Sequence, residues 1–107
     1  MFDAERRVVI AFQEAGHAVA AFALGATLLH VSIAQPEPVT IYDTDELEVM
    51  AQATIAGPIA QRRYIPMENP YRETGCAKDE AQFMALVCSK VAHARLVREP
   101  LGDGGSL

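Results

Sequence analysis

The sequence predicts a mainly α-helical α+β fold with about three helices and one or two short strands. Three long stretches are rich in helix-forming residues, and breaks containing glycine and proline separate them. A short stretch after the first of them alternates in the manner of a strand. The chain has 107 residues, enough for one small domain and too few for two. Its 50% hydrophobic and 21% charged residues suit a folded protein.

The first helix is expected over residues 4–24, which contain many alanines and no proline. Asp3 can act as its N-cap, because a carboxylate accepts hydrogen bonds from the unpaired amides of the first turn. Gly25 follows at a position where helices commonly end in the left-handed conformation. Residues 28–33 alternate as a strand does, and residues 39–42 can form a second short strand or an extended edge.

The second helix is expected over residues 45–64. Residues 43–46 resemble a capping box with an acidic first turn, which suits the helix dipole. Gly57 and Pro58 are expected to interrupt this helix with a kink, because proline removes one backbone donor and crowds the preceding turn.

The remaining chain is expected to hold a loop and a third helix. The loop, residues 65–74, contains two prolines, and the helix begins near Cys76 or Ala77 and ends near Arg98. Residues 1–101 then form a single domain, and residues 102–107 form a mobile tail. Six apolar residues at helical spacing predict a core stripe on the third helix: Phe83, Met84, Leu86, Val87, Val91 and Leu96.

An apolar group lies near the proline-rich loop. It consists of Tyr64, Met67 and Tyr71. Partial burial in the core is the preferred interpretation, and an exposed patch that binds a partner is the alternative.

Charge and hydropathy exclude several classes of protein. The net charge of −5 argues against sequence-independent nucleic-acid binding, which depends on clustered Lys and Arg. Charged residues precede the first apolar run, Val8 to Leu24, so we expect no secretory signal. We also expect no membrane span there, because Gln13, Glu14 and His17 interrupt the run and such groups are costly in a bilayer.

The two cysteines do not suggest a disulfide framework. Cys76 and Cys88 lie twelve positions apart in one expected helix, too far to bridge within it. A reducing, cytoplasmic setting is therefore expected. A domain of this size buries only roughly 60–68% of its unfolded surface, so packing against a second copy, as a homo-oligomer, would add stability.

The residues most suggestive of chemistry lie on the first expected helix. Gln13 and His17 are four positions apart and share a face, and Glu14 projects beside them. In the motif H-E-x-x-H, two histidines at this spacing hold one zinc ion while the glutamate activates the bound water. Here Gln13 occupies the first histidine position. Spacing alone favours a surface glutamate and a packed histidine over a metal site.

Four segments together resemble the peptidase domain of the FtsH-type ATP-dependent zinc metallopeptidases. The first helix resembles that family's H-E-A-G-H-A segment, and residues 29–33 resemble the strand that follows it. Residues 55–61 are similar to the family's G-G-R-A-A-E segment, and residues 75–79 to its G-A-S-x-D segment. The four matches occur in the family's order and cover most of the chain. The resemblance implies a zincin-like peptidase core.

The resemblance also implies roles for particular residues. His17 and Asp79 correspond to zinc ligands, and Glu14 to the general base that takes a proton from the zinc-bound water. Gln13 stands at the remaining, degenerate ligand position, and an amide oxygen is a poor zinc donor. No G-x-x-x-x-G-K segment is present, so the family's ATP site is not expected.

Two hypotheses of function follow. The first is a pseudopeptidase that binds a peptide or protein partner or serves in assembly, with Gln13 and Glu14 hydrogen-bonded to His17 or Asp79. The second is an active zinc-dependent peptidase in which another residue replaces the missing ligand. Cys76, three residues before Asp79, and His30, on the adjoining strand, are the candidates. A buried, inert Cys76 and a strand-packed His30 are the preferred interpretations.

Overall fold

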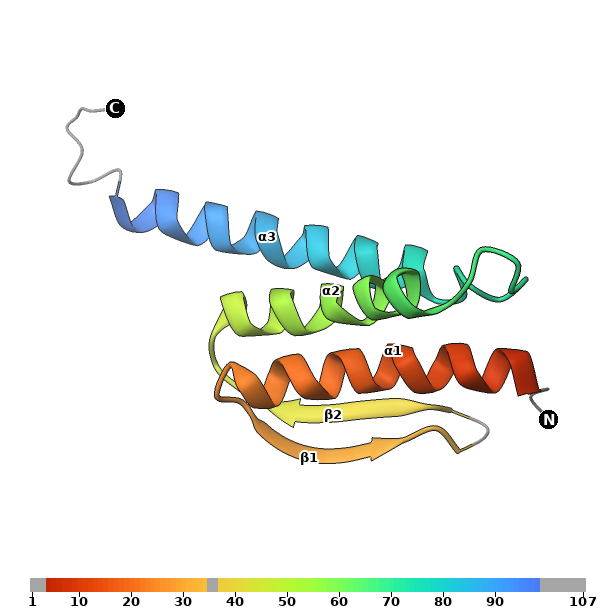
Figure 1. The fold of residues 1–107 in the computed structure, drawn as a ribbon. Helices are drawn as coiled ribbons and strands as arrows, with labels where there is room; N and C mark the ends of the chain where they lie inside the picture. The colour runs from red at the N-terminus through yellow and green to blue at the C-terminus, as the bar shows by residue number, and fades with distance from the viewer. Residues whose placement is uncertain (1–3, 35–36, 99–107) are drawn as a thin grey trace.

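The fold is a layer of three helices with a small sheet packed against the first of them. The computed structural model describes residues 4–34 and 37–98, with side chains described as far as residue 92. The elements are α1 (Ala4–Ala23), β1 (Thr27–Ser32), β2 (Val39–Asp43), α2 (Leu47–Tyr64) and α3 (Cys76–Arg98). Helix α2 lies between α1 and α3, and both strands contact α1 (Figure 1). This arrangement confirms the predicted three helices and small β element.

Some sequence predictions lie outside the described residues. They are the N-cap at Asp3, the tail over residues 102–107 and the side chain of Leu96. The predicted end of α1 is confirmed, because the helix ends at Ala23 and Gly25, two residues later, has a φ of 91°. No helix in the described part of the chain is long and apolar enough to cross a membrane.

The two predicted strands form an antiparallel pair. The register joins Thr27 to Asp43 and Ser32 to Val39, with an irregularity between Leu28 and His30. The side chains of Thr40 and Tyr42 both point toward the helices. The Thr40 hydroxyl contacts α1, and Tyr42 packs against the core. Strand β2 therefore carries the groups that connect the sheet to the helices.

The predicted capping box at the start of α2 is wrong. The N-cap is Glu46, whose backbone is extended and whose side chain makes no capping hydrogen bond. The Thr44 hydroxyl instead accepts a hydrogen bond from the Glu46 amide at 3.2 Å, inside the preceding loop. A short hydroxyl that bonds the backbone two residues ahead closes a local turn, and this competes with capping.

Helix α2 is not interrupted at Gly57 and Pro58, contrary to the prediction. The helix runs to Tyr64 with Pro58 inside it, and both residues are buried. This segment of α2 packs closely against α1. On the α1 side, a Cβ atom added to Gly16 would lie 2.5 Å from the Ala56 carbonyl oxygen.

The core is made of small side chains. Its buried cluster consists of Ala21, Ala26, Val49 and Ala53, with Ala20 and Tyr42 packed against it. Because these residues are small, α1 and α2 approach closely, and the His17 side chain of α1 reaches the Ala53 carbonyl of α2. The packing of these two helices therefore places the polar side of α1 that carries His17 against α2.

The predicted core stripe of α3 is wrong for two of its residues. Met84 and Val91 are exposed, whereas Phe83, Leu86 and Val87 are half-buried. Helix α3 packs along α2 and reaches α1 through the Asp79 side chain, and its C-terminal end extends past the start of α2 (Figure 1). Met84 and Val91 lie to one side of the line that Phe83, Leu86 and Val87 follow, so a helix packed along that line leaves them exposed.

The preferred interpretation of the apolar group near the loop is also wrong for two residues. Tyr64 and Met67 are exposed, and Tyr71 is half-buried as expected. Tyr64 stacks on Phe12 of α1, with ring centroids 5.3 Å apart. It therefore extends the outer surface of α1 instead of entering the core.

Candidate functional site

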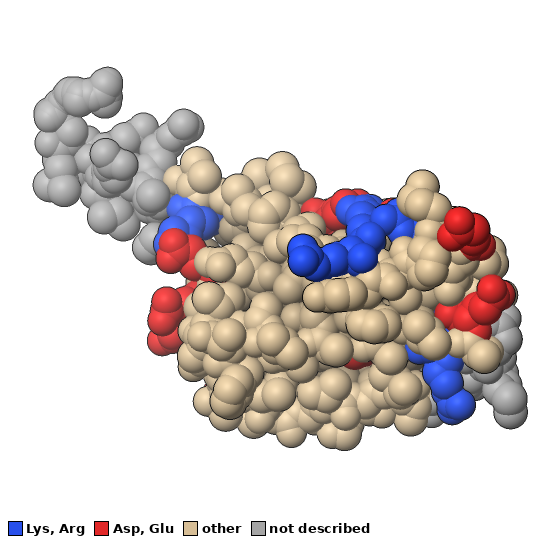
Figure 2. All heavy atoms as spheres, in the orientation of Figure 1, with Lys and Arg blue, Asp and Glu red and all other residues tan. Residues whose placement is uncertain are grey.

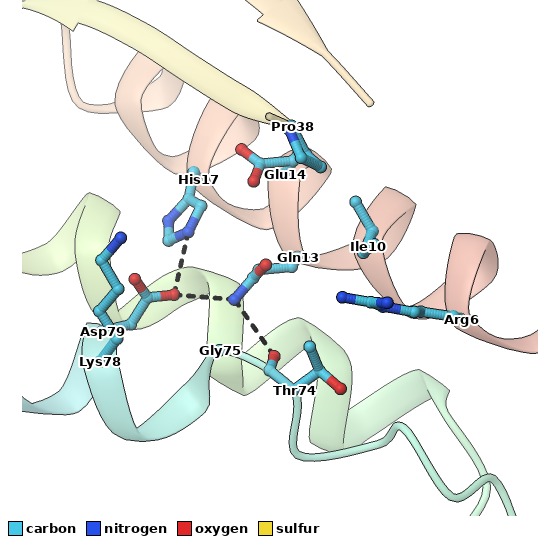
Figure 3. Close-up of a pocket in the computed structure, with 10 residues that line it drawn as sticks. All are labelled: Arg6, Ile10, Gln13, Glu14, His17, Pro38, Thr74, Gly75, Lys78 and Asp79. Atoms are coloured by element: carbon cyan, nitrogen blue, oxygen red, sulfur yellow. Dashed lines mark hydrogen bonds and ion pairs between the residues drawn. The ribbon is translucent and has the colours of Figure 1, made fainter. Parts of the chain in front are cut away.

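A polar cluster forms where α1 faces the start of α3. Gln13 and His17 project from α1, and Asp79 projects toward both from the first turn of α3 (Figure 3). The structure thus joins Asp79 to two residues that lie 62 and 66 positions before it (79 minus 17 and 79 minus 13). Asp79 Oδ2 lies at the centre of the cluster.

His17 is oriented by contacts at both ring nitrogens. Its Nδ1 lies 2.7 Å from the Ala53 carbonyl oxygen, which can only accept, so Nδ1 carries a proton. Its Nε2 lies 3.2 Å from Asp79 Oδ2. Burial lowers the pKa of His17, but the hydrogen bonds to Asp79 and Ala53 and the charges of Asp79 and Glu14 together raise it above 6.5. Protonation of Nε2 completes an ion pair with Asp79.

Gln13 supplies a second donor to the same carboxylate. Its side-chain Nε2 donates to Asp79 Oδ2 at 3.0 Å and to the Thr74 carbonyl oxygen at 3.5 Å. Both partners are acceptors, so they select the orientation that points the amide nitrogen, not the amide oxygen, at Asp79. This hydrogen bond confirms the expectation that Gln13 bonds to His17 or Asp79.

Two glycines make room for these side chains. A Cβ atom at Gly57 would lie 2.5 Å from His17 Cε1 and 2.6 Å from Nε2. A Cβ atom at Gly75 would overlap the Gln13 amide, and Gly75 also has a φ of 81°, which disfavours other residues. Glycine at these two positions therefore lets the imidazole and the amide reach Asp79.

Glu14 is held apart from this cluster. Its side chain is buried, and Oε1 accepts a hydrogen bond from the Thr40 hydroxyl of β2 at 2.6 Å. The expectation that Glu14 hydrogen-bonds to His17 or Asp79 is wrong, because the strand supplies its donor. Glu14 still lines the same cavity and acts on His17 through its charge.

Neither candidate substitute ligand joins the cluster. Cys76 is buried, and its Sγ donates to Gln61 Oε1 at 3.5 Å. Burial raises the pKa of the Cys76 thiol, which disfavours the thiolate that metals bind. His30 is exposed on β1. The expectation of a buried Cys76 is therefore confirmed, whereas His30 lies on the strand but is exposed and not packed.

Gln61 and Arg72, which the sequence did not single out, position the loop that carries Thr74 and Gly75. Gln61 is fully buried, and its Nε2 donates to the carbonyl oxygens of Arg72 and Thr74 at 3.2 and 2.7 Å. The Arg72 guanidinium donates to the Arg62 and Ile65 carbonyls at the end of α2. The signal that could have identified Gln61 is a polar residue within an apolar helical segment. Its hydrogen-bond partners lie outside that helix, so the helix pattern alone does not reveal them.

The cluster forms one wall of a partly open cavity of about 280 Å³. The cavity lies between α1, the end of the loop and the residue before β2 (Figure 3). Both signs of charge and several uncharged groups line it: Arg6, Ile10, Gln13, Glu14, His17, Pro38, Thr74, Gly75, Lys78 and Asp79. Such a surface can hold a peptide through polar groups and a few apolar contacts.

The donor set does not fit a catalytic zinc ion. Such an ion needs three protein ligands and one open position. His17 and Asp79 supply two, and the third position presents the N–H groups of the Gln13 amide. Within the described residues, no three His, Cys, Asp or Glu side chains lie close enough to hold a metal ion together.

Comparison with known proteins identified no relative. No protein-family model, curated protein sequence or solved structure matched the chain significantly.

The His17–Asp79 pair predicts that the protein loses stability as the solution becomes alkaline. The pKa of His17 is raised in the folded protein, so its contribution is complete below the ordinary value of 6.5 and is lost as pH rises through the folded value. Urea unfolding between about pH 6 and about pH 9 should show this fall. The fall should shrink in Asp79→Asn and persist in Asp45→Asn, which removes an exposed carboxylate elsewhere. Equal slopes in all three proteins would contradict the ion pair.

Proposed function

We propose that this chain is a pseudopeptidase: a zincin-like scaffold related to the FtsH-type peptidase domain that binds a peptide or protein partner without catalysing hydrolysis. The observation that carries the proposal is the hydrogen bond from the Gln13 amide to the Asp79 carboxylate. It occupies the place where the family resemblance implies a metal between a histidine and this aspartate.

The polar cluster supports this proposal because it is complete without a cation. Asp79 Oδ2 receives the Gln13 amide at 3.0 Å and faces His17 Nε2 at 3.2 Å, and the other His17 nitrogen bonds the Ala53 carbonyl. A carboxylate that is largely removed from water requires hydrogen-bond donors or a positive charge nearby. Here the Gln13 amide N–H and the protonated His17 ring supply them. A zinc ion at this place would have to displace the Gln13 amide from Asp79, and the amide N–H group could not bind the metal in return.

The position of Glu14 supports the same conclusion. A general base must lie within hydrogen-bond reach of the proton that it removes. The Glu14 carboxylate instead accepts the Thr40 hydroxyl at 2.6 Å and connects α1 to β2. The cavity beside it has cationic and anionic side chains on its wall, including Arg6 and Lys78, so an extended peptide with a carboxylate and polar groups is the ligand class that it suits.

One observation favours the alternative, an active zinc-dependent peptidase. The Nδ1–H of His17 donates to a backbone carbonyl, which leaves Nε2 directed at the cluster. Metal-binding histidines are commonly oriented in this way. The alternative still requires a third ligand, and neither Cys76 nor His30 lines the cavity.

Gln13→His tests the proposal, because it restores the third ligand type on the same helical face. We expect this variant to bind one zinc ion at least about 100-fold more tightly than the natural protein. Competition with a colorimetric zinc chelator measures this affinity in the metal-free proteins. Gln52→His, on an exposed position of α2, is the matched control and should bind no more tightly than the natural protein.

Two results would refute the pseudopeptidase. One is stoichiometric, tight zinc binding by the natural protein. The other is peptide hydrolysis by the natural protein that Glu14→Gln abolishes. If Gln13→His binds no zinc while its fold is unchanged, the relation to the zincin scaffold is refuted instead.

A further inference from the structure

Helix α1 is apolar on its outer side as well as on its buried side. Five residues follow one another at spacings of four and three along the outer side: Val8, Phe12, Ala15, Val19 and Phe22. We call them the outer stripe. All five are exposed, and Val19 and Phe22 are 67% and 72% exposed. A helix with apolar residues on two sides is normally covered on both of them, yet most of the outer stripe is open to solvent.

Helix α2 continues the outer stripe. Tyr64 stacks on Phe12, and Ile59 is exposed one turn from the Ala56 carbonyl that contacts Gly16 of α1. Figure 2 shows a broad area over α1 and the sheet that is almost free of charged side chains. The exposed apolar residues of the stripe, with Ile59 and Tyr64, present on the order of 600 Å² to solvent, the upper end for a patch on a monomer.

The outer stripe is complementary to itself when two copies of α1 run antiparallel. With Ala15 opposite Ala15, Val8 of one copy faces Phe22 of the other, and Phe12 faces Val19. Large residues then meet smaller ones, and the alanines allow close approach at the centre. A parallel pair would set Phe against Phe and Val against Val. Antiparallel helices also bring the positive end of each helix dipole beside the negative end of the other.

We propose that two copies of this chain pair through the outer stripes of their α1 helices, antiparallel, about a two-fold axis near Ala15. A specific interface buries about 800 Å² on each partner, and the outer stripe with Ile59 and Tyr64 supplies most of that area. This interface lies opposite the Gln13–His17 side of α1, so it does not rest on the proposed binding function.

A second copy suits this surface better than a membrane. Helices that bind anionic bilayers pair an apolar face with many Lys and Arg. The chain has a net charge of −5, and α1 carries no basic residue in its last turn. Two copies of an uncharged stripe meet without burying any charge.

The oligomeric state of the full chain tests the proposal. Sedimentation equilibrium should give a dimer for the natural protein. Val19→Glu should raise its dissociation constant at least about 100-fold, because it buries two unpaired carboxylates. Phe22→Glu should act in the same way. Met67→Glu, which alters an equally exposed apolar residue outside the stripe, should leave the dissociation constant within about two-fold. Circular dichroism confirms that each variant is folded.

Cross-linking tests the orientation in a Cys88→Ser background, since Cys88 is exposed and Cys76 is buried. In the antiparallel pair, Val8→Cys of one copy lies beside Phe22→Cys of the other, so a mixture of the two variants should form a disulfide. Val8→Cys alone should not, because the two cysteines would lie roughly 20 Å apart.

Three outcomes would overturn the proposal. A natural protein that stays monomeric at about 100 µM, above the µM-to-pM range of Kd for interfaces of standard size, would do so, whether or not it sediments with phosphatidylcholine–phosphatidylglycerol vesicles. A dimer that survives both Val19→Glu and Phe22→Glu would show a different interface. A disulfide formed by Val8→Cys alone would show a parallel pair.

Discussion

Gly57→Ala is expected to lower the free energy of unfolding by about 2–3 kcal/mol, as overpacking does in tight interiors. The added methyl carbon would lie 2.5 Å from Cε1 and 2.6 Å from Nε2 of His17. The imidazole cannot easily move aside, because the Ala53 carbonyl holds one nitrogen and Asp79 faces the other. Alanine otherwise favours a helix over glycine by about 1 kcal/mol, so destabilisation would run against helix propensity. Urea unfolding at about pH 6 measures the change.

A double-mutant cycle provides the control for this prediction. In a His17→Ala background the ring is gone, so Gly57→Ala should cost little or even stabilise through helix propensity. The difference between the two backgrounds isolates the contact between the imidazole and residue 57. An equal cost in both backgrounds would mean that the glycine is required for another reason.

Gln61→Ala is expected to destabilise the protein by about 2–4 kcal/mol, because it leaves buried polar groups without partners. Gln61 donates to the carbonyl oxygens of Arg72 and Thr74 and accepts from the Cys76 thiol. Its side chain is fully buried, so water cannot readily replace it. Urea unfolding of the natural and variant proteins measures the loss.

Gln52→Ala is the matched control, because Gln52 is an exposed glutamine on the same helix. It should change stability by less than about 0.5 kcal/mol. Gln61→Ala should also weaken the hydrogen bond between Gln13 and Thr74, since it loosens the loop that carries that carbonyl. Faster amide exchange at Gly75 and Cys76 would report this loosening. A stability equal to that of Gln52→Ala would mean that the loop is held by other contacts.

Much of the candidate site could be predicted from the sequence. Helical periodicity alone put Gln13 and His17 on one face of a helix. Asp79 was identified from four segments that resemble the family and occur in its order. Only the first of these segments was specific by itself. What could not be predicted was which atoms meet. Gln13 could have offered its oxygen or its nitrogen, and the choice depends on the acceptors that the loop and α3 bring to it.

The separation of Glu14 from His17 shows the same limit. Their spacing of three predicts neighbouring positions, and both line one cavity. The direction of the Glu14 carboxylate depends on Thr40, which belongs to a strand formed later in the chain. A single helix pattern contains no information about that strand's register.

The third helix shows where periodicity misleads. Its apolar residues recur at helical spacing, yet Met84 and Val91 are exposed. Periodicity predicts which residues share a face, but burial requires an element to pack against that face. The outer stripe of α1 is likewise exposed, and the contact of Tyr64 with Phe12 covers only a small part of it.

By itself the sequence determined the helices, the first strand, the turn at Gly25 and the residues that α1 presents together, because each depends on short-range spacing and local backbone preference. Only the tertiary structure decided three hydrogen bonds. The Gln13 amide bonds Asp79, the Glu14 carboxylate bonds Thr40 of β2, and the Cys76 thiol bonds Gln61. These pairings join residues far apart in the chain. Each depends on how closely the elements that carry the two residues pack together, and for α1 and α2 the small residues between them set that distance.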